Sequence, residues 1–134
     1  MAVAETGARL MVAPNCHRAV IEKAKALGLA ALPGVATPSE AFAALAAGAD
    51  GLKMFPGEML PPVVLKAWLA VLPAGTMLLP VGGVTLDNMG GYFAAGAAGI
   101  GIGSALYRPG VSAGELAARA NSFVRRYREL SPIG

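Results

Sequence analysis

Five short apolar runs recur along the chain at intervals that leave room for one helix between successive runs. The runs are residues 9–13, 30–33, 51–55, 77–81 and 99–103. Their apolarity is continuous rather than alternating, which is typical of parallel strands covered on both faces. The chain is therefore predicted to contain five consecutive βα units. This alternation predicts an α/β fold, either a doubly wound sheet or a (β/α) barrel, and short units with glycine turns favour the barrel.

Capping signals mark where helices begin between the runs. Thr37-Pro38-Ser39-Glu40 has the pattern of a capping box, and residues 112–115 repeat it before the last helix. Further helices are expected over residues 16–27, 62–72 and 86–95. The last helix carries an apolar stripe, so its arginines are interpreted as a solvated face. The stripe comprises Leu116, Ala120, Phe123, Val124 and Tyr127, and the arginines are Arg119, Arg125, Arg126 and Arg128.

Composition limits the class of protein. The length of 134 residues predicts a single domain, residues 1–134. Apolar residues make up 55% and charged residues 14%, which argues against disorder. The net charge of +3 arises from one C-terminal segment without interleaved aromatic residues, so no nucleic-acid partner is expected. Proline and glycine interrupt the two long uncharged stretches, residues 67–86 and 88–107, so no membrane span is expected either.

A few residues are set aside as weaker candidates. Cys16 and His17 are the one cysteine and the one histidine, too few for a disulfide or a structural zinc site, and no role is assigned to them. Glu58 follows the third run and is a candidate proton donor, or else a solvated loop residue. A single cysteine and no secretory signal lead us to expect a protein of the reducing cytoplasm.

Lys53 lies in the middle of the third apolar run. Leu52 and Met54 share one face of the predicted strand, so Lys53 and Phe55 project to the other. Burial of a lysine lowers its pKa, and the neutral amine that results can attack a ketone to form a Schiff base. The alternative is a lysine that reaches solvent at the strand end or pairs with a carboxylate. No acidic residue stands beside it in sequence, so we favour the nucleophile.

Two glycine turns follow the fourth and fifth runs. Gly82-Gly83 precedes a predicted helix, and Gly103-Ser104 ends the fifth run in the same way. Such turns let main-chain N–H groups approach an anion, and a helix N-terminus would add the positive end of its dipole. Barrel enzymes frequently bind phosphate with the loops after their last two strands. The sequence thus predicts a phosphate site, with tight turning in the absence of any ligand as the alternative.

Three segments together resemble the class I aldolases that cleave 2-keto-3-deoxy-6-phospho sugar acids. They are residues 51–56, 79–84 and 103–107. The resemblance implies a small (β/α)8 barrel, usually a trimer, that needs no metal and no organic cofactor. It implies a Schiff base between Lys53 and pyruvate, and a pocket wall at Pro14 beside the lysine. It also implies that Gly82, Gly83 and Ser104 bind the substrate phosphate, with Gly103 in the same turn as Ser104.

The resemblance also points to a substrate. Val81 stands where the gluconate-type enzymes tend to have threonine, and valine is similar to the galactonate-type branch. We therefore expect reversible cleavage of 2-keto-3-deoxy-6-phosphogalactonate to pyruvate and glyceraldehyde 3-phosphate. The 6-phosphogluconate-specific aldolase is the alternative.

One departure from the family pattern affects the expected rate. The five runs correspond to the last five of the family's eight strands, so the chain is predicted to form the C-terminal portion of the barrel. The general-base glutamate and the substrate-binding arginine belong to the first three units. Proton transfer would then rest on water, the substrate phosphate or Glu58, and loss of a positioned base costs about 10²–10⁴-fold in rate. Two other functions stay open: an impaired remnant that binds phosphate esters and folds only as an assembly, and another phosphate-handling barrel enzyme.

Overall fold

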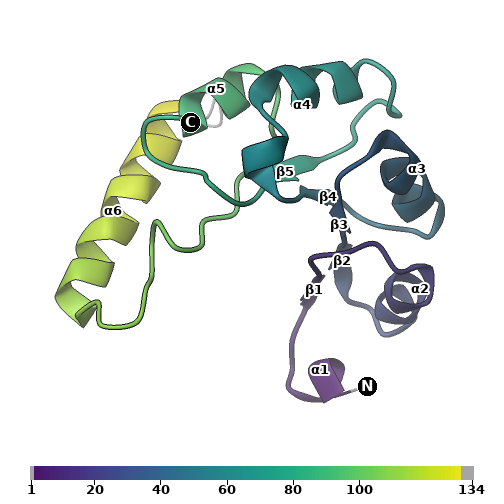
Figure 1. The fold of residues 1–134 in the computed structure, drawn as a ribbon. Helices are drawn as coiled ribbons and strands as arrows, with labels where there is room; N and C mark the ends of the chain where they lie inside the picture. The colour runs from purple at the N-terminus through teal and green to yellow at the C-terminus, as the bar shows by residue number, and fades with distance from the viewer. Residues whose placement is uncertain (1, 131–134) are drawn as a thin grey trace.

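Parallel strands alternate with helices along most of the chain in the computed structural model, which describes residues 2–130 (Figure 1). The strands are β1 (Leu10–Val12), β2 (Ala30–Leu32), β3 (Gly34–Val35), β4 (Leu52–Met54) and β5 (Leu78–Pro80). The helices are α1 (Ala2–Glu5), α2 (Arg18–Ala26), α3 (Pro38–Ala46), α4 (Pro62–Leu69), α5 (Met89–Ala94) and α6 (Ala113–Leu130), and a 3-10 turn spans Gly57–Met59. The helices α2, α3 and α4 follow one another along one side of the strands (Figure 1).

The strands lie side by side in the order of the sequence. β1 pairs with β2, β3 with β4 and β4 with β5, all in parallel. β2 and β3 are one extended segment that Pro33 divides, because proline has no N–H to donate to a ladder. The Pro33 carbonyl still accepts a hydrogen bond from the Lys53 N–H at 2.9 Å, so the segment stays joined to β4. The prediction of an α/β fold built from successive parallel units is confirmed.

The fifth apolar run is less regular than predicted. Within residues 99–103 only Gly101 forms a bridge, to Val81 just beyond β5. Glycines in a strand leave no side chain to pack and weaken pairing. A Cβ added at Gly101 would lie 2.5 Å from Val81 Cγ2. The two segments therefore approach too closely at this point for a residue larger than glycine.

The predicted capping boxes are present. The Thr37 hydroxyl accepts a hydrogen bond from the Glu40 N–H, and the Glu40 carboxylate accepts one from the Thr37 N–H. Ser112 and Glu115 make the same reciprocal pair before α6. The remaining helices are shorter than predicted: α2 begins at Arg18, α4 ends at Leu69, and α5 begins only at Met89. The short α1 was not predicted.

The strands bury one face and leave the other half-exposed, which corrects the prediction of strands covered on both faces. Side chains that face the helices are almost completely buried: Ala31, Val35, Leu52, Met54 and Leu78 are 0–1% exposed. Lys53 and Leu79 alternate with them and are only partly buried. Helices pack on one side of the strands, so the alternate side chains lack a comparable layer over them (Figure 1).

The apolar stripe of α6 is only partly covered. Phe123 is buried, and Tyr127 packs edge-on against Phe93 of α5 with 5.5 Å between ring centres. Val124 is nevertheless 46% exposed and Tyr127 37% exposed. Helical periodicity identified the stripe, but it does not determine how much of the stripe a neighbouring element covers.

The Asp50 carboxylate, in the loop before β4, forms hydrogen bonds with α2 and with β2. It accepts hydrogen bonds from Lys25 Nζ of α2 at 2.7 Å and from the Ala31 N–H of β2 at 2.7 Å. The hydrogen bond from Lys25, followed by the one from Ala31, holds the pKa of the Asp50 carboxyl below its usual range. Both side chains of the Lys25–Asp50 pair are more than a third exposed, so solvent screens the attraction between them.

Replacing Asp50 with asparagine is expected to lower the free energy of unfolding by about 1 kcal/mol at neutral pH. A lowered folded pKa contributes stability that is fully present above the pKa of an unfolded aspartate, about 3.9, and that is lost as the pH falls through the folded value. Urea unfolding of both proteins should therefore show a difference that shrinks towards about pH 2. A difference of constant size across this range would contradict the assignment. Glu22→Gln, which removes a surface pair with Arg18, serves as the control and should change stability less.

Candidate active site

Lys53 stands on the half-exposed face of β4, as strand alternation predicts. In register it lies between Gly34 of β3 and Leu79 of β5. Its Nζ lies 4.5 Å from the centre of the Phe55 ring, the next residue on the same face. Among the described residues no carboxylate forms an ion pair with Lys53. The lysine is half-buried rather than fully enclosed, because this face of the strands is open.

The Pro14 loop lies against the strand next to Lys53. A Cβ added at Gly34 would overlap the main-chain carbon and oxygen of Pro14, so only glycine fits at this position. The Gly34 N–H also donates a hydrogen bond to the Asn15 carbonyl at 3.3 Å. Gly34 pairs with Lys53, and the structure therefore places exposed Pro14 one strand away from the lysine.

A cavity of about 340 Å³ opens beyond the ends of β4 and β5. It brings together both glycine turns singled out in the sequence: Val81, Gly82, Gly83, Gly103 and Ser104 all line it. Phe55 lines it as well and connects it with Lys53, whose Nζ rests on the Phe55 ring. Lys53 and Pro14 are not lining residues, so they lie beside the cavity rather than in its wall.

The glycine turns offer main-chain donors to the cavity. Gly82 and Gly83 have φ values of +104° and +66°, a region that favours glycine. Within residues 2–130, the N–H groups of Gly83, Ser104 and Ala105 donate no hydrogen bond to another protein group. Free main-chain N–H groups in a concave loop region can bind an anion. The geometry suits the predicted phosphate site.

The helix predicted after the first glycine turn begins later than expected. Thr85 and Asn88 first close a turn, in which the Thr85 N–H donates to Asn88 Oδ1 at 2.8 Å. The helix α5 begins only after that turn and is six residues long. After Ser104 the next helix, α6, begins at Ala113. Any anion in the cavity would therefore be held by main-chain N–H groups and side chains.

Sequence reasoning missed Arg108, which also lines the cavity. Its Nε donates a hydrogen bond to the Ser104 carbonyl at 3.0 Å, and this bond keeps the guanidinium beside the second glycine turn. A guanidinium is well suited to bind phosphate oxygens. The signal that could have identified Arg108 is a basic residue four positions after Ser104, in the second predicted phosphate turn. Glu58 lines the same cavity and is exposed, and its role as a proton donor or a solvated loop residue stays a prediction.

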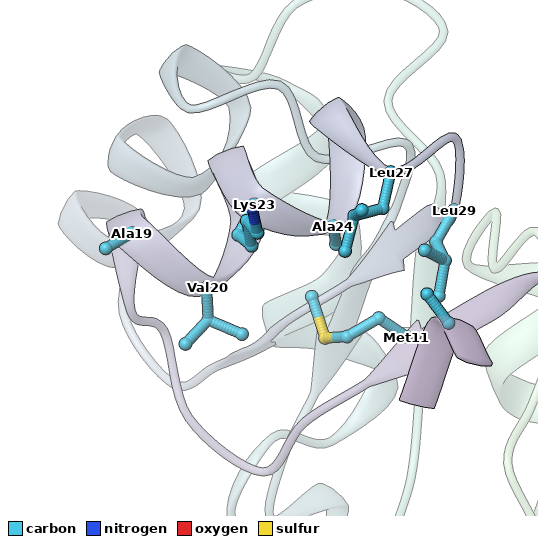
Figure 2. Close-up of a pocket in the computed structure, with 8 residues that line it drawn as sticks. Met11, Ala19, Val20, Lys23, Ala24, Leu27 and Leu29 are labelled. Atoms are coloured by element: carbon cyan, nitrogen blue, oxygen red, sulfur yellow. The ribbon is translucent and has the colours of Figure 1, made fainter. Parts of the chain in front are cut away.

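Other hollows offer less chemistry. A second cavity, of about 350 Å³, lies between α2 and β1. Figure 2 shows side chains that line it, among them Met11 and Leu29, and Val20 and Leu27. Its lining is almost entirely apolar.

The Cys16 thiol donates to the Glu40 carbonyl at 3.8 Å, and burial raises the pKa of that thiol. Over residues 2–130 we find no cluster of three or more potential metal ligands, and no helix with the length and apolarity needed to cross a membrane.

Comparisons with known proteins agree with the resemblance seen in the sequence. The family model for KDPG and KHG aldolases matches residues 1–120. The chain is 47% identical over 128 residues to 2-dehydro-3-deoxy-6-phosphogalactonate aldolase of Escherichia coli K12, covering 96% of this chain and 62% of that protein.

Solved structures give the same answer. A native KDPGal structure matches with a TM-score of 0.94 and 46% identity, covering 96% of this chain and 63% of the other. A cube-shaped protein cage designed by fusing symmetric oligomeric domains matches equally well, with a TM-score of 0.94 and 46% identity, over 96% of this chain and 48% of the cage chain. The chain thus spans about three fifths of the length of the natural proteins it resembles.

Proposed function

The chain belongs to the KDPG and KHG aldolase family, and from this premise we propose that it is a class I aldolase acting through a Schiff base on Lys53. The reaction would be reversible cleavage of 2-keto-3-deoxy-6-phosphogalactonate to pyruvate and glyceraldehyde 3-phosphate. One observation carries the proposal. Lys53 and Phe55 share a strand face, and Phe55 lines the cavity that holds both glycine turns. An amine nucleophile and an anion cradle therefore lie at the same end of the strands.

The chemistry follows from these positions. Lys53 Nζ attacks the substrate ketone and expels water to form an iminium ion. The C4 hydroxyl loses its proton to water and becomes the aldehyde of the departing product, while the iminium accepts the electron pair of the breaking carbon–carbon bond. The phosphate leaves with that aldehyde product. Protonation of the resulting enamine and hydrolysis release pyruvate and restore the amine. Gly82, Gly83, Gly103, Ser104 and Arg108 would hold the phosphate, and Pro14 would bound the keto acid beside Lys53.

We place the five units in a single domain, residues 1–134, as the C-terminal portion of a (β/α)8 barrel. Strands in sequence order with helices along one side support this arrangement. So does the edge strand β1, whose Leu10 and Val12 are 47% and 52% exposed.

The preference for the galactonate epimer rests on Val81, which lines the cavity. Replacing Val81 with threonine would add a hydroxyl at the wall between the lysine side and the phosphate side. We expect the ratio of kcat/KM for the two C4 epimers to shift towards 2-keto-3-deoxy-6-phosphogluconate by about tenfold. Steady-state assays with each epimer measure this ratio. An unchanged ratio would mean that the preference is set elsewhere.

We also expect self-association, as a trimer by family resemblance, and a cytoplasmic location that suits the lone Cys16. Exposed Val124 and Tyr127 on α6 provide an apolar surface for contact between copies. The solved structure built from symmetric oligomeric domains adds support. Light scattering of the purified protein gives the number of copies directly.

Borohydride trapping tests the proposed chemistry. Reduction in the presence of pyruvate should fix a pyruvyl adduct on the peptide that contains Lys53, detected by mass spectrometry. Folded protein that yields no adduct would overturn the aldolase proposal. The half-exposure of Lys53 favours one second candidate, a protein that binds phosphate esters without forming an imine. Binding of a phosphorylated ligand with no adduct would support that alternative.

A further inference from the structure

The Glu58 side chain lies over the turn where the proposed function places the substrate phosphate. A Cβ added at Gly82 would lie 2.5 Å from Glu58 Oε2, and one added at Gly83 would lie 2.6 Å from Glu58 Cγ. Glu58 itself lines the cavity. Its carboxylate therefore covers the same glycine pair whose backbone is proposed to hold an anion.

Little in the structure holds this carboxylate in place. Glu58 is exposed, and among the described residues it forms no ion pair. Arg108, the cation of the same cavity, donates its Nε hydrogen bond to the Ser104 carbonyl. The buried Tyr92 hydroxyl donates to the Gly57 carbonyl at 3.1 Å, and the nearby Glu58 charge adds to burial in raising the pKa of Tyr92. The Glu58 side chain is free to turn away from the glycines.

We propose that Glu58 competes with phosphate for the Gly82-Gly83 turn and so lowers the affinity of this site for phosphate. The inference rests on the proposed function, which supplies the anion cradle. A phosphate bound at the Gly82-Gly83 turn would lie next to the Glu58 carboxylate, and the two negative charges would repel each other. Binding of the phosphate therefore requires Glu58 to turn away from the glycines. A phosphate tethered to a keto acid gains further contacts beside Lys53 that offset this cost. Free inorganic phosphate gains none, so Glu58 keeps the turn clear of the free anion at concentrations at which the tethered phosphate still binds.

Calorimetric titration with inorganic phosphate tests the competition. Glu58→Gln should bind inorganic phosphate on the order of tenfold more tightly than the wild-type chain, since one nearby negative charge is removed from a solvated site. Glu58→Asp keeps the charge on a shorter side chain and should give an intermediate affinity. Asp87→Asn is the matched control: Asp87 is exposed near the same loops but does not line the cavity, so its removal should leave the affinity unchanged.

The outcomes separate this inference from the proposed function. If Glu58→Gln binds inorganic phosphate no better than wild type, the competition is refuted while the cradle stands. If Asp87→Asn tightens binding as much as Glu58→Gln does, the effect is one of net charge, and the assignment to Glu58 is overturned. If none of the proteins binds phosphate, the cradle and the competition are both overturned. The pyruvyl adduct on Lys53 is measured separately and reports on the aldolase chemistry alone.

Discussion

Replacing Lys53 with methionine is expected to abolish the borohydride-trapped pyruvyl adduct and to lower aldol cleavage by more than about 10³-fold. Methionine has a similar length but no amine, and class I chemistry has no other electron sink in this site. The substitution should leave the fold intact. Lys53 is only half-buried and pairs with no described carboxylate, so its removal strands no buried charge. Mass spectrometry after trapping and a coupled assay for pyruvate release measure both effects.

Lys66→Met is the matched control for this substitution. Lys66 lies exposed on α4 and takes no part in the site, so this variant should keep both the adduct and the turnover. A pyruvyl adduct that persists in Lys53→Met on some other lysine would move the nucleophile away from β4. Unchanged turnover without any adduct would favour a different phosphate-handling reaction.

The parts of the fold that local sequence determines were predicted well. The capping boxes at Thr37 and Ser112 are set by residues three positions apart, and both are present. The alternation that exposes Lys53 between Leu52 and Met54 follows from the two-residue period of a strand and needs no knowledge of distant residues. The grouping of both glycine turns in one cavity likewise follows from parallel strands that end at the same edge.

Features that depend on contacts between residues distant in sequence could not be predicted from the sequence. Within residues 99–103 the pairing is limited to the bridge between Gly101 and Val81, and Glu58 lies over Gly82 and Gly83 of a different loop. A helix was expected from Leu86, whereas residues 86–88 form a turn and α5 spans Met89–Ala94. Arg108 escaped notice because nothing in the sequence shows that it folds back onto Ser104.

Replacing Gly57 with alanine is expected to lower the free energy of unfolding by about 2–3 kcal/mol and to weaken phosphate binding at the same time. Gly57 is buried where β4 and β5 end, and its N–H donates to the Val81 carbonyl at 2.7 Å. A Cβ there would overlap the Gly82 carbonyl oxygen and lie 3.0 Å from the Val81 oxygen. These main-chain atoms of Val81 and Gly82 cannot move aside as a flexible side chain would. The Gly82-Gly83 turn must therefore shift.

Gly103→Ala separates this steric effect from the general cost of losing a glycine. Gly103 lines the same cavity, but a Cβ added there meets no heavy atom within 4 Å. Its stability should stay within about 0.5 kcal/mol of wild type, or rise slightly because alanine restricts the unfolded chain. Urea unfolding of both variants and titration of Gly57→Ala with inorganic phosphate give the comparison. If Gly57→Ala were as stable as Gly103→Ala and bound phosphate normally, the contact between the ends of β4 and β5 would not be what positions the glycine turn.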